Sequence, residues 1–125
     1  MILGLRTAQF HVKPQNLSAV RDWYARCLGV SPYFDEPFYV GFNLGGFEFG
    51  LVPDEYATEE VQGGTHVYWG VADIAAAVTA MVNCGGIDET GIQDVGGGIR
   101  KAAIRDPFGN RFGLIENPHF AKIEP

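Results

Sequence analysis

The sequence predicts an α+β fold built from two βαβββ modules, because three observations agree. Strand-like alternation and helix-like spacing follow one another in the same order twice along the 125 residues. The two predicted helices match at a constant offset of 57, which places Asn16 and Asp73 at equivalent positions. The two closing strands match at an offset of 65, which pairs Phe47 with Phe112. Since neither half can bury a sheet alone, both sheets should form one structure.

The first module covers residues 1–53. Residues 5–12 alternate between apolar and polar side chains, as in a strand with one buried face. Leucine, valine and aromatic residues at helical spacing predict a helix that begins after Asn16 and ends at Gly29. Two further strands, over 38–44 and 47–52, should form a hairpin whose turn is Gly45-Gly46.

The second module, residues 65–118, repeats this order after an acidic linker over 54–64. Its helix is predicted to begin at the N-cap Asp73 and to end at Gly85-Gly86. Its strands are predicted over 65–71, 99–104 and 111–116, with a turn at 106–110 between the last two. A tail over 119–125 completes a single domain of 125 residues.

Composition excludes several classes of protein. Apolar residues make up 46% of the chain and charged residues 19%, which is the reverse of a disordered composition. The net charge of −6 argues against nucleic acid or an anionic membrane surface as a partner. No apolar run approaches the roughly 20 residues that a membrane span needs.

The two cysteines indicate a reducing compartment. Cys27 and Cys84 both fall in predicted helices, and nothing in the sequence brings them together. We interpret them as reduced thiols of a cytoplasmic protein, with a disulfide as the alternative.

Three segments resemble the vicinal-oxygen-chelate superfamily, which includes glyoxalase I, the bleomycin and fosfomycin resistance proteins and the extradiol dioxygenases. These segments are residues 16–29, residues 65–74 and the motif Asp106-Pro107-Phe108-Gly109-Asn110-Arg111-Phe112. The resemblance implies two curved mixed sheets around a cup, with the helices outside and the active site inside. It also implies a homodimer, which would cover an open sheet edge of each chain. Because this fold carries many activities, it specifies none of them.

In the metal enzymes of this family, ligands come from the first and last strand of each module. Carried over through the internal repeat, these four positions are Thr7 (or Gln9), Glu48, His66 and Gly113. Only Glu48 and His66 are good ligands for zinc, nickel, manganese or iron, and a catalytic metal generally needs three. A third ligand could be Gln9 or His11, so a divalent metal stays possible, although no cofactor is the favoured prediction.

Strand alternation predicts which side chains face the cup. They are a mixed set of hydroxyl, amide, aromatic and charged residues: Thr7, Gln9, His11, Tyr39, Asn43, Glu48, His66, Tyr68 and Arg111. Such a lining suits a small polar or aromatic molecule. In the alternative interpretation these side chains fill the cup themselves, His66 bonds a neighbour, and Glu48 pairs with Arg111.

Three functions follow from these alternatives. The favoured one is a glyoxalase- or bleomycin-resistance-like protein with a degenerate metal site that binds a small organic molecule. The second is a metal-dependent lyase, isomerase or dioxygenase, in which Glu48 is the best candidate for a catalytic residue. The third is a non-catalytic dimeric interaction module.

Overall fold

The computed structural model describes residues 5–57 and 66–119, which form two compact units over 1–60 and 61–125 (unit 1 and unit 2). Each unit contains one helix and one mixed sheet, so the predicted α+β class is confirmed. Linker residues 58–64, Thr65 and tail residues 120–125 lie outside the described residues.

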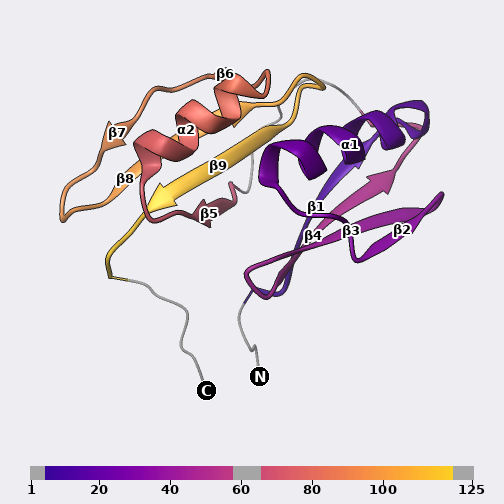
Figure 1. Ribbon diagram of the computed structural model, residues 1–125, viewed down its shortest axis with the longest axis horizontal. Helices are drawn as coiled ribbons and strands as arrows, with labels where there is room; N and C mark the ends of the chain where they lie inside the picture. Colours follow the sequence, from indigo (N-terminus) through magenta and orange to yellow (C-terminus); the bar gives the residue numbers. More distant parts are fainter. Residues whose placement is uncertain (1–4, 58–65, 120–125) are drawn as a thin grey trace. The chain divides into compact units, whose positions relative to one another are not determined.

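Unit 1 is a βαβββ module (Figure 1). Its elements are β1 (Thr7–Val12), a 3-10 helix (Pro14–Asn16), α1 (Leu17–Leu28), β2 (Phe34–Glu36), β3 (Tyr39–Leu44) and β4 (Phe47–Pro53). The strand order of this sheet, sheet A, is β1-β4-β3-β2. β1 runs parallel to β4, and the other pairs are antiparallel.

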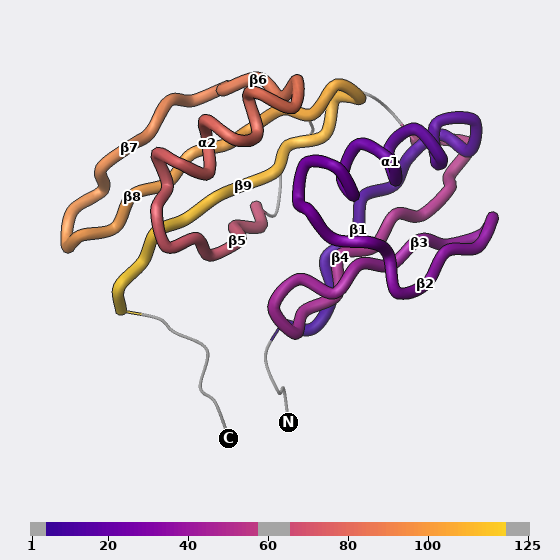
Figure 2. The backbone as a smooth tube through the Cα atoms, in the orientation of Figure 1, coloured from indigo at the N-terminus to yellow at the C-terminus, as the bar shows by residue number. Residues whose placement is uncertain are grey.

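Unit 2 repeats this topology, as the backbone trace in Figure 2 shows. Its elements are β5 (Tyr68–Gly70), α2 (Ile74–Asn83), β6 (Ile87–Asp88), β7 (Gln93–Asp94), β8 (Arg100–Arg105) and β9 (Arg111–Glu116). In sheet B the order is β5-β9-β8-β6, and β7 also pairs with β8. β6 and β7 together therefore occupy the position that β2 has in sheet A. Neither helix of the described residues is long and apolar enough to cross a membrane.

Three parts of the sequence prediction need correction. Within residues 66–71, the described part of the strand predicted over 65–71, the strand is limited to Tyr68–Gly70, which pairs with β9. The strands β2, β6 and β7 lie in segments for which the sequence pattern predicts no strand. They have only two or three residues each, which is too short for alternation to be recognised. The first helix is also preceded by a 3-10 turn, and the Asn16 side chain makes no capping hydrogen bond.

The core of unit 1 is the aromatic layer between α1 and sheet A. The burial of alternate residues follows the predicted pattern: Val12, Val40, Phe42, Phe49 and Leu51 are buried, whereas Thr7, Gln9 and His11 are exposed. From α1, Val20, Trp23 and Tyr24 are buried against this face. The opposite face of sheet A therefore carries the exposed polar side chains of β1.

The predicted turns and helix ends are largely confirmed. Asp73 caps α2, because its carboxylate accepts a hydrogen bond from Ala76 N at 3.1 Å. Gly29 ends α1 with φ of 67°, in the left-handed region. Gly45 and Gly46 also have positive φ, as the two central residues of a type I′ hairpin turn require.

Candidate functional site

The candidate site lies on the face of sheet A that does not contact α1. The register pairs Thr7 of β1 with Glu48 of β4, and Glu48 with Asn43 of β3. Directly paired residues on neighbouring strands point to the same face. The fold thus brings together three of the residues that alternation predicted to face the cup.

Glu48 is the centre of a hydrogen-bonded group, which we call the Glu48 cluster: Glu48, Thr7, Tyr33 and Tyr39. Its Oε1 accepts hydrogen bonds from Tyr39 Oη at 2.8 Å and from Thr7 Oγ1 at 3.3 Å. Its Oε2 accepts one from Tyr33 Oη. Three hydroxyl groups from three separate segments of unit 1 therefore hold one carboxylate.

Two glycines allow the tyrosine rings to lie against the sheet. A side chain at Gly50 would collide with Tyr39 Oη, and a Cβ at Gly41 would lie 2.9 Å from Tyr33 Cε1. Both glycines are buried, and neither has a positive φ. Glycine is therefore needed at these positions for the space it leaves, and not for an unusual backbone conformation.

The hydrogen bonds of the Glu48 cluster shift the pKa values of Glu48, Tyr33 and Tyr39. The hydrogen bond from Tyr33, and weaker ones from Tyr39 and Thr7, lower the pKa of the Glu48 carboxyl against an opposing effect of burial. The same hydrogen bond raises the pKa of Tyr33 to about 12. Burial, and then the bond to Glu48, raise the pKa of Tyr39, while a hydrogen bond from Gln9 opposes this. At neutral pH the carboxylate is ionised and both phenols keep their protons.

We expect the pKa of Glu48 to rise when Tyr33 is replaced by phenylalanine, because the largest cause of its depression is removed. Because the pKa of Glu48 is lower in the folded state, ionisation of its carboxyl group stabilises the fold at pH values above the unfolded-state pKa. This stabilisation is lost as the pH falls through the folded-state pKa. NMR titration of the Glu48 carboxyl carbon measures the shift directly. Tyr56 is 92% exposed, so Tyr56→Phe is the control that should leave the value unchanged. An equal Glu48 pKa in wild type and Tyr33→Phe would contradict the prediction.

An open pocket of about 360 Å³ adjoins the cluster. It is lined by Arg6, Thr7, Tyr33, Asn43, Gly46, Phe47 and Glu48, and we call it the Glu48 pocket. Its volume lies within the range of sites for small organic molecules. The lining combines one acid, one base, two aromatic rings and several neutral hydrogen-bonding groups.

The two candidates for a third metal ligand in unit 1 have other partners. Gln9 interacts with Tyr39 and lies opposite Gly50. His11 lies opposite Val52, four residues along β4 from Glu48, which is about 13 Å at the rise of a strand. Its Nδ1 pairs with Asp54 Oδ2 at 3.0 Å, and this contact lowers the pKa of Asp54. The structure therefore does not bring His11 to Glu48.

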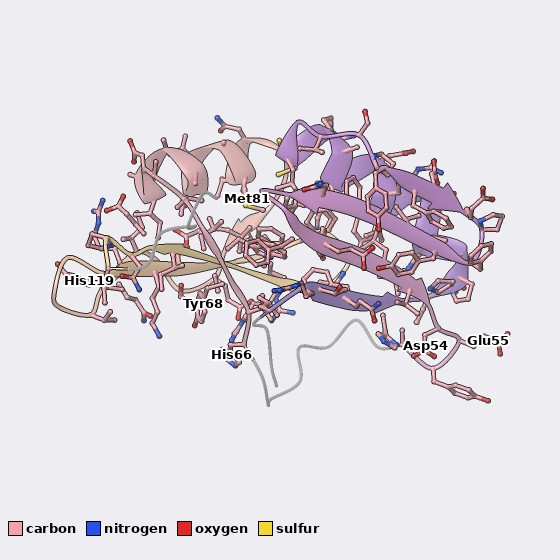
Figure 3. The ribbon with its side chains drawn as sticks, turned by 90° about the horizontal axis from the view of Figure 1, so that it is seen from below. Asp54, Glu55, His66, Tyr68, Met81 and His119 are labelled. Carbon is pink, nitrogen blue, oxygen red and sulfur yellow. The ribbon has the colours of Figure 1, made fainter. Side chains whose placement is uncertain are left out.

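In unit 2, His66 precedes β5 and is exposed, with its ring centroid 6.5 Å from that of Tyr68 (Figure 3). Tyr68 pairs with Gly113 as Thr7 pairs with Glu48, so Tyr68 has the place in sheet B that Thr7 has in sheet A. The ammonium group of Lys101 lies 5.6 Å from the centre of the Tyr68 ring. This part of unit 2 is thus aromatic and basic.

Gly113 has no room for a side chain. A Cβ there would meet the backbone oxygen of Val67 and the ring of Tyr68. A carboxylate at this position would require the backbone before β5 to move. Glu116 is not a substitute, since its Oε1 accepts a hydrogen bond from Ile74 N at the start of α2.

The residues present do not fit the divalent metal that the family resemblance implies. Within residues 5–57 and 66–119, no three histidine, cysteine, aspartate or glutamate side chains are grouped closely enough to hold a metal ion. Thr7 is a weak ligand, and three hydroxyl groups already bond to Glu48.

Arg111 belongs to an ion-pair cluster in unit 2. Its Nη2 contacts Glu89 Oε1, and Arg105 Nε lies 2.8 Å from Glu89 Oε2 without the alignment of a hydrogen bond. Arg111, and to a lesser extent Arg105, lower the pKa of Glu89. In the sequence Arg111 was a candidate partner of Glu48, whereas the structure pairs it with a residue of its own unit.

Sequence reasoning missed three residues of these clusters: Tyr33, Glu89 and Arg105. Tyr33 and Glu89 lie in segments without a readable period, beside the short strands β2 and β6, and Arg105 lies one residue beyond the strand predicted over 99–104. The available signal was Gly41, a glycine inside a predicted strand, because such a glycine often marks the close approach of another group. Nothing in the sequence singled out Glu89.

Comparison with known proteins identifies relatives of this fold. A family model described as the Glyoxalase/Bleomycin resistance protein/Dioxygenase superfamily matches residues 8–114. The comparison with curated proteins gave no match.

Three solved structures illustrate the similarity. A Bacillus anthracis protein described as belonging to the glyoxalase family has a TM-score of 0.78 at 17% identity and covers 94% of this chain and 97% of its own. A lactoylglutathione lyase from Agrobacterium tumefaciens has a TM-score of 0.75 at 16% identity, covering 96% and 98%. A superfamily member from Sphaerobacter thermophilus DSM 20745 has a TM-score of 0.73 at 22% sequence identity. The match covers 94% of this chain and 99% of that protein. At these identities the likeness shows the fold alone.

Proposed function

The chain belongs to the glyoxalase/bleomycin resistance protein/dioxygenase superfamily, and from this premise we propose that it binds a small organic molecule in the Glu48 pocket without a divalent metal. The observation that carries the proposal is a partly buried carboxylate that three hydroxyl groups hold in place beside a pocket of about 360 Å³. A preorganised polar group in a partly aromatic hollow is the usual design of a ligand site.

The electrostatics of the cluster support binding over proton transfer. A general acid or base works best when its pKa lies near the working pH. Here the pKa of Glu48 is shifted down and the pKa values of Tyr33 and Tyr39 are shifted up, so all three move away from neutrality. The cluster is therefore suited to present a fixed charge and fixed hydroxyl groups to a ligand.

The degenerate metal site supports the same proposal. Of the four positions that the family resemblance assigns to ligands, Thr7 bonds to Glu48, and Gly113 is closed by the backbone of Val67. The alternative, a metal-dependent lyase, isomerase or dioxygenase, needs ligands that these two positions do not provide. A screen in EDTA, with metal added afterwards, distinguishes it from metal-free binding.

The experiment is a thermal-shift screen of small organic molecules on protein dialysed against EDTA. A ligand at 100 times its Kd should stabilise the fold by about 2.7 kcal/mol. We expect at least one compound to raise the Tm in EDTA, and Glu48→Gln to abolish that shift. Stabilisation that appears only after zinc, nickel, manganese or iron is added would overturn the proposal in favour of the metal enzyme.

A second variant tests the part played by the tyrosines. We expect Gly50→Ala to weaken binding of a screened ligand by about tenfold, because the new methyl group displaces Tyr39 Oη from Glu48. Competition titration of wild type and variant measures the change. Gly70→Ala is the matched control, since a Cβ at this strand glycine meets no atom within 4 Å. Equal affinity in Gly50→Ala and wild type would show that the Tyr39 contact is not used.

Two further properties are part of the proposal. A homodimer is supported by the exposed edge strand β2, whose three residues are all solvent-exposed. A cytoplasmic location rests on the interpretation of Cys27 and Cys84 as reduced thiols in two separate helical segments. Light scattering and fractionation of cells that express the chain would test these two predictions.

A further inference from the structure

We infer that the ligand of the Glu48 pocket is an organic cation, a protonated amine or a quaternary ammonium with an apolar body, for which Glu48 is the counter-ion. This inference rests on the proposed function and adds to it the chemical class of the ligand. It follows from the charge, the remaining acceptor capacity and the aromatic surroundings of one carboxylate.

The Glu48 carboxylate accepts hydrogen bonds, but no ion pair among the described residues neutralises its charge. Its partners in the described part of unit 1 are the hydroxyl groups of Thr7, Tyr33 and Tyr39, all of them neutral donors. None of the ion pairs among the described residues involves Glu48. Glu89 in unit 2 is a partly buried carboxylate that has two arginines instead. A cation is therefore the partner that Glu48 lacks.

The carboxylate also has room for one more donor. Two oxygens offer about four acceptor sites, and three are used. Oε1 accepts from Tyr39 and Thr7, while Oε2 accepts from Tyr33 alone. A protonated amine can therefore donate to Oε2 without displacing any of the three hydroxyl groups, whereas a quaternary ammonium group would be held there by its charge alone.

Exposed aromatic rings continue from the cluster along β2. The ring of Tyr33 is followed by Phe34 at 6.5 Å, and Phe34 by Phe38 at 5.8 Å and Tyr39 at 6.1 Å. Tyr33 is 61% exposed and Phe38 is 67% exposed, which is unusual for large apolar rings. The face of an aromatic ring attracts a cation. Tyr33 lines the Glu48 pocket and can contact an ammonium group there, while Phe34 and Phe38 extend the apolar surface beyond it.

The two other charge classes fit less well. An anionic ligand would be repelled by Glu48 at the pocket wall. A neutral aromatic molecule could use the rings but would leave the carboxylate without a counter-ion. Arg6 also lines the pocket, and its Nη1 donates a hydrogen bond to Leu5 O.

The test compares three probes that share a benzyl group and differ in charge: the cation benzyltrimethylammonium, its neutral isostere neopentylbenzene, and the smaller anion phenylacetate. Isothermal titration at low ionic strength gives their Kd values for wild type, Glu48→Gln and Glu55→Gln. Glu55 is exposed and is the charge-matched control. We expect the cation to bind wild type and Glu55→Gln at least tenfold more tightly than the neutral probe, and this preference to vanish in Glu48→Gln.

A second measurement does not depend on a variant. Benzyltrimethylammonium cannot titrate, so its affinity for wild type should fall as pH drops through the pKa of Glu48, while that of the neutral probe should stay constant. Preference for the neutral or anionic probe, or a cation preference that survives Glu48→Gln, would overturn the inference while the proposed function stands. Binding of no probe, together with no hit in the EDTA screen, would overturn both.

Discussion

Replacing Phe49 by alanine is expected to lower the free energy of unfolding by about 3–5 kcal/mol. Phe49 is 0% exposed and lies in β4, an inner strand of sheet A, where its ring contacts other aromatic rings of unit 1. The ring centroids of Phe10, Tyr24 and Phe42 are 5.2, 4.9 and 5.9 Å away. Truncation removes all three contacts and leaves a cavity that the sheet and α1 cannot close by a small shift.

Urea unfolding, followed by fluorescence and by circular dichroism, measures this loss. Phe49→Leu keeps most of the volume and should cost less than about 1.5 kcal/mol. Phe38→Ala removes the same ring from an exposed position, and should change stability by no more than about 0.5 kcal/mol. A loss below about 1.5 kcal/mol in Phe49→Ala would mean that this ring does not hold α1 on sheet A.

The second large effect is expected at Asp106, which is 1% exposed and organises the turn between β8 and β9. Its Oδ1 accepts hydrogen bonds from Phe108 N and Asn110 N, each at 2.8 Å, and its Oδ2 accepts one from Asn110 Nδ2 at 2.8 Å. Alanine leaves these donors without their acceptor in a turn that is only partly exposed. We expect a loss of about 3 kcal/mol, since unsatisfied buried groups each cost about 1–3 kcal/mol.

The same unfolding assay tests this prediction. Asp106→Asn keeps one carbonyl oxygen for the two backbone donors and should lose about half as much stability. Asp94 accepts a comparable bond from Gly96 N at 2.9 Å in an exposed turn, so Asp94→Ala should cost about 0.5 kcal/mol. If Asp106→Ala and Asp94→Ala were equally stable, burial of the turn would not be the cause.

Several elements could be predicted from local sequence, and the structure confirms them. The burial of Val12 beside exposed His11 follows the alternation of β1. The cap at Asp73 and the left-handed glycines of the Gly45-Gly46 turn depend on residues at most three positions away. The internal repeat gave the common topology of the two units, because equivalent strands keep equivalent neighbours.

The candidate site could be predicted only in part. Alternation placed Thr7, Asn43 and Glu48 on one face of sheet A, and the register confirms that they share it. Alternation could not predict that Tyr33 belongs to the site, because this residue precedes a strand of only three residues in a segment without a hydrophobic period. Nor could it pair Arg111 with Glu89, since the path of the segment after α2 decides which acid reaches that arginine.

The sequence by itself thus determined the α+β class, the two repeated modules, the main hairpin turn and the buried face of each long strand. These features depend on period and on contacts over a few residues. Only the tertiary structure decided the partners of Glu48, the closure of Gly113 by Val67 and the short strand β5. Those outcomes depend on strand register and on the paths of the connecting segments, which bring together distant residues such as Thr7 and Glu48, 41 positions apart in the chain.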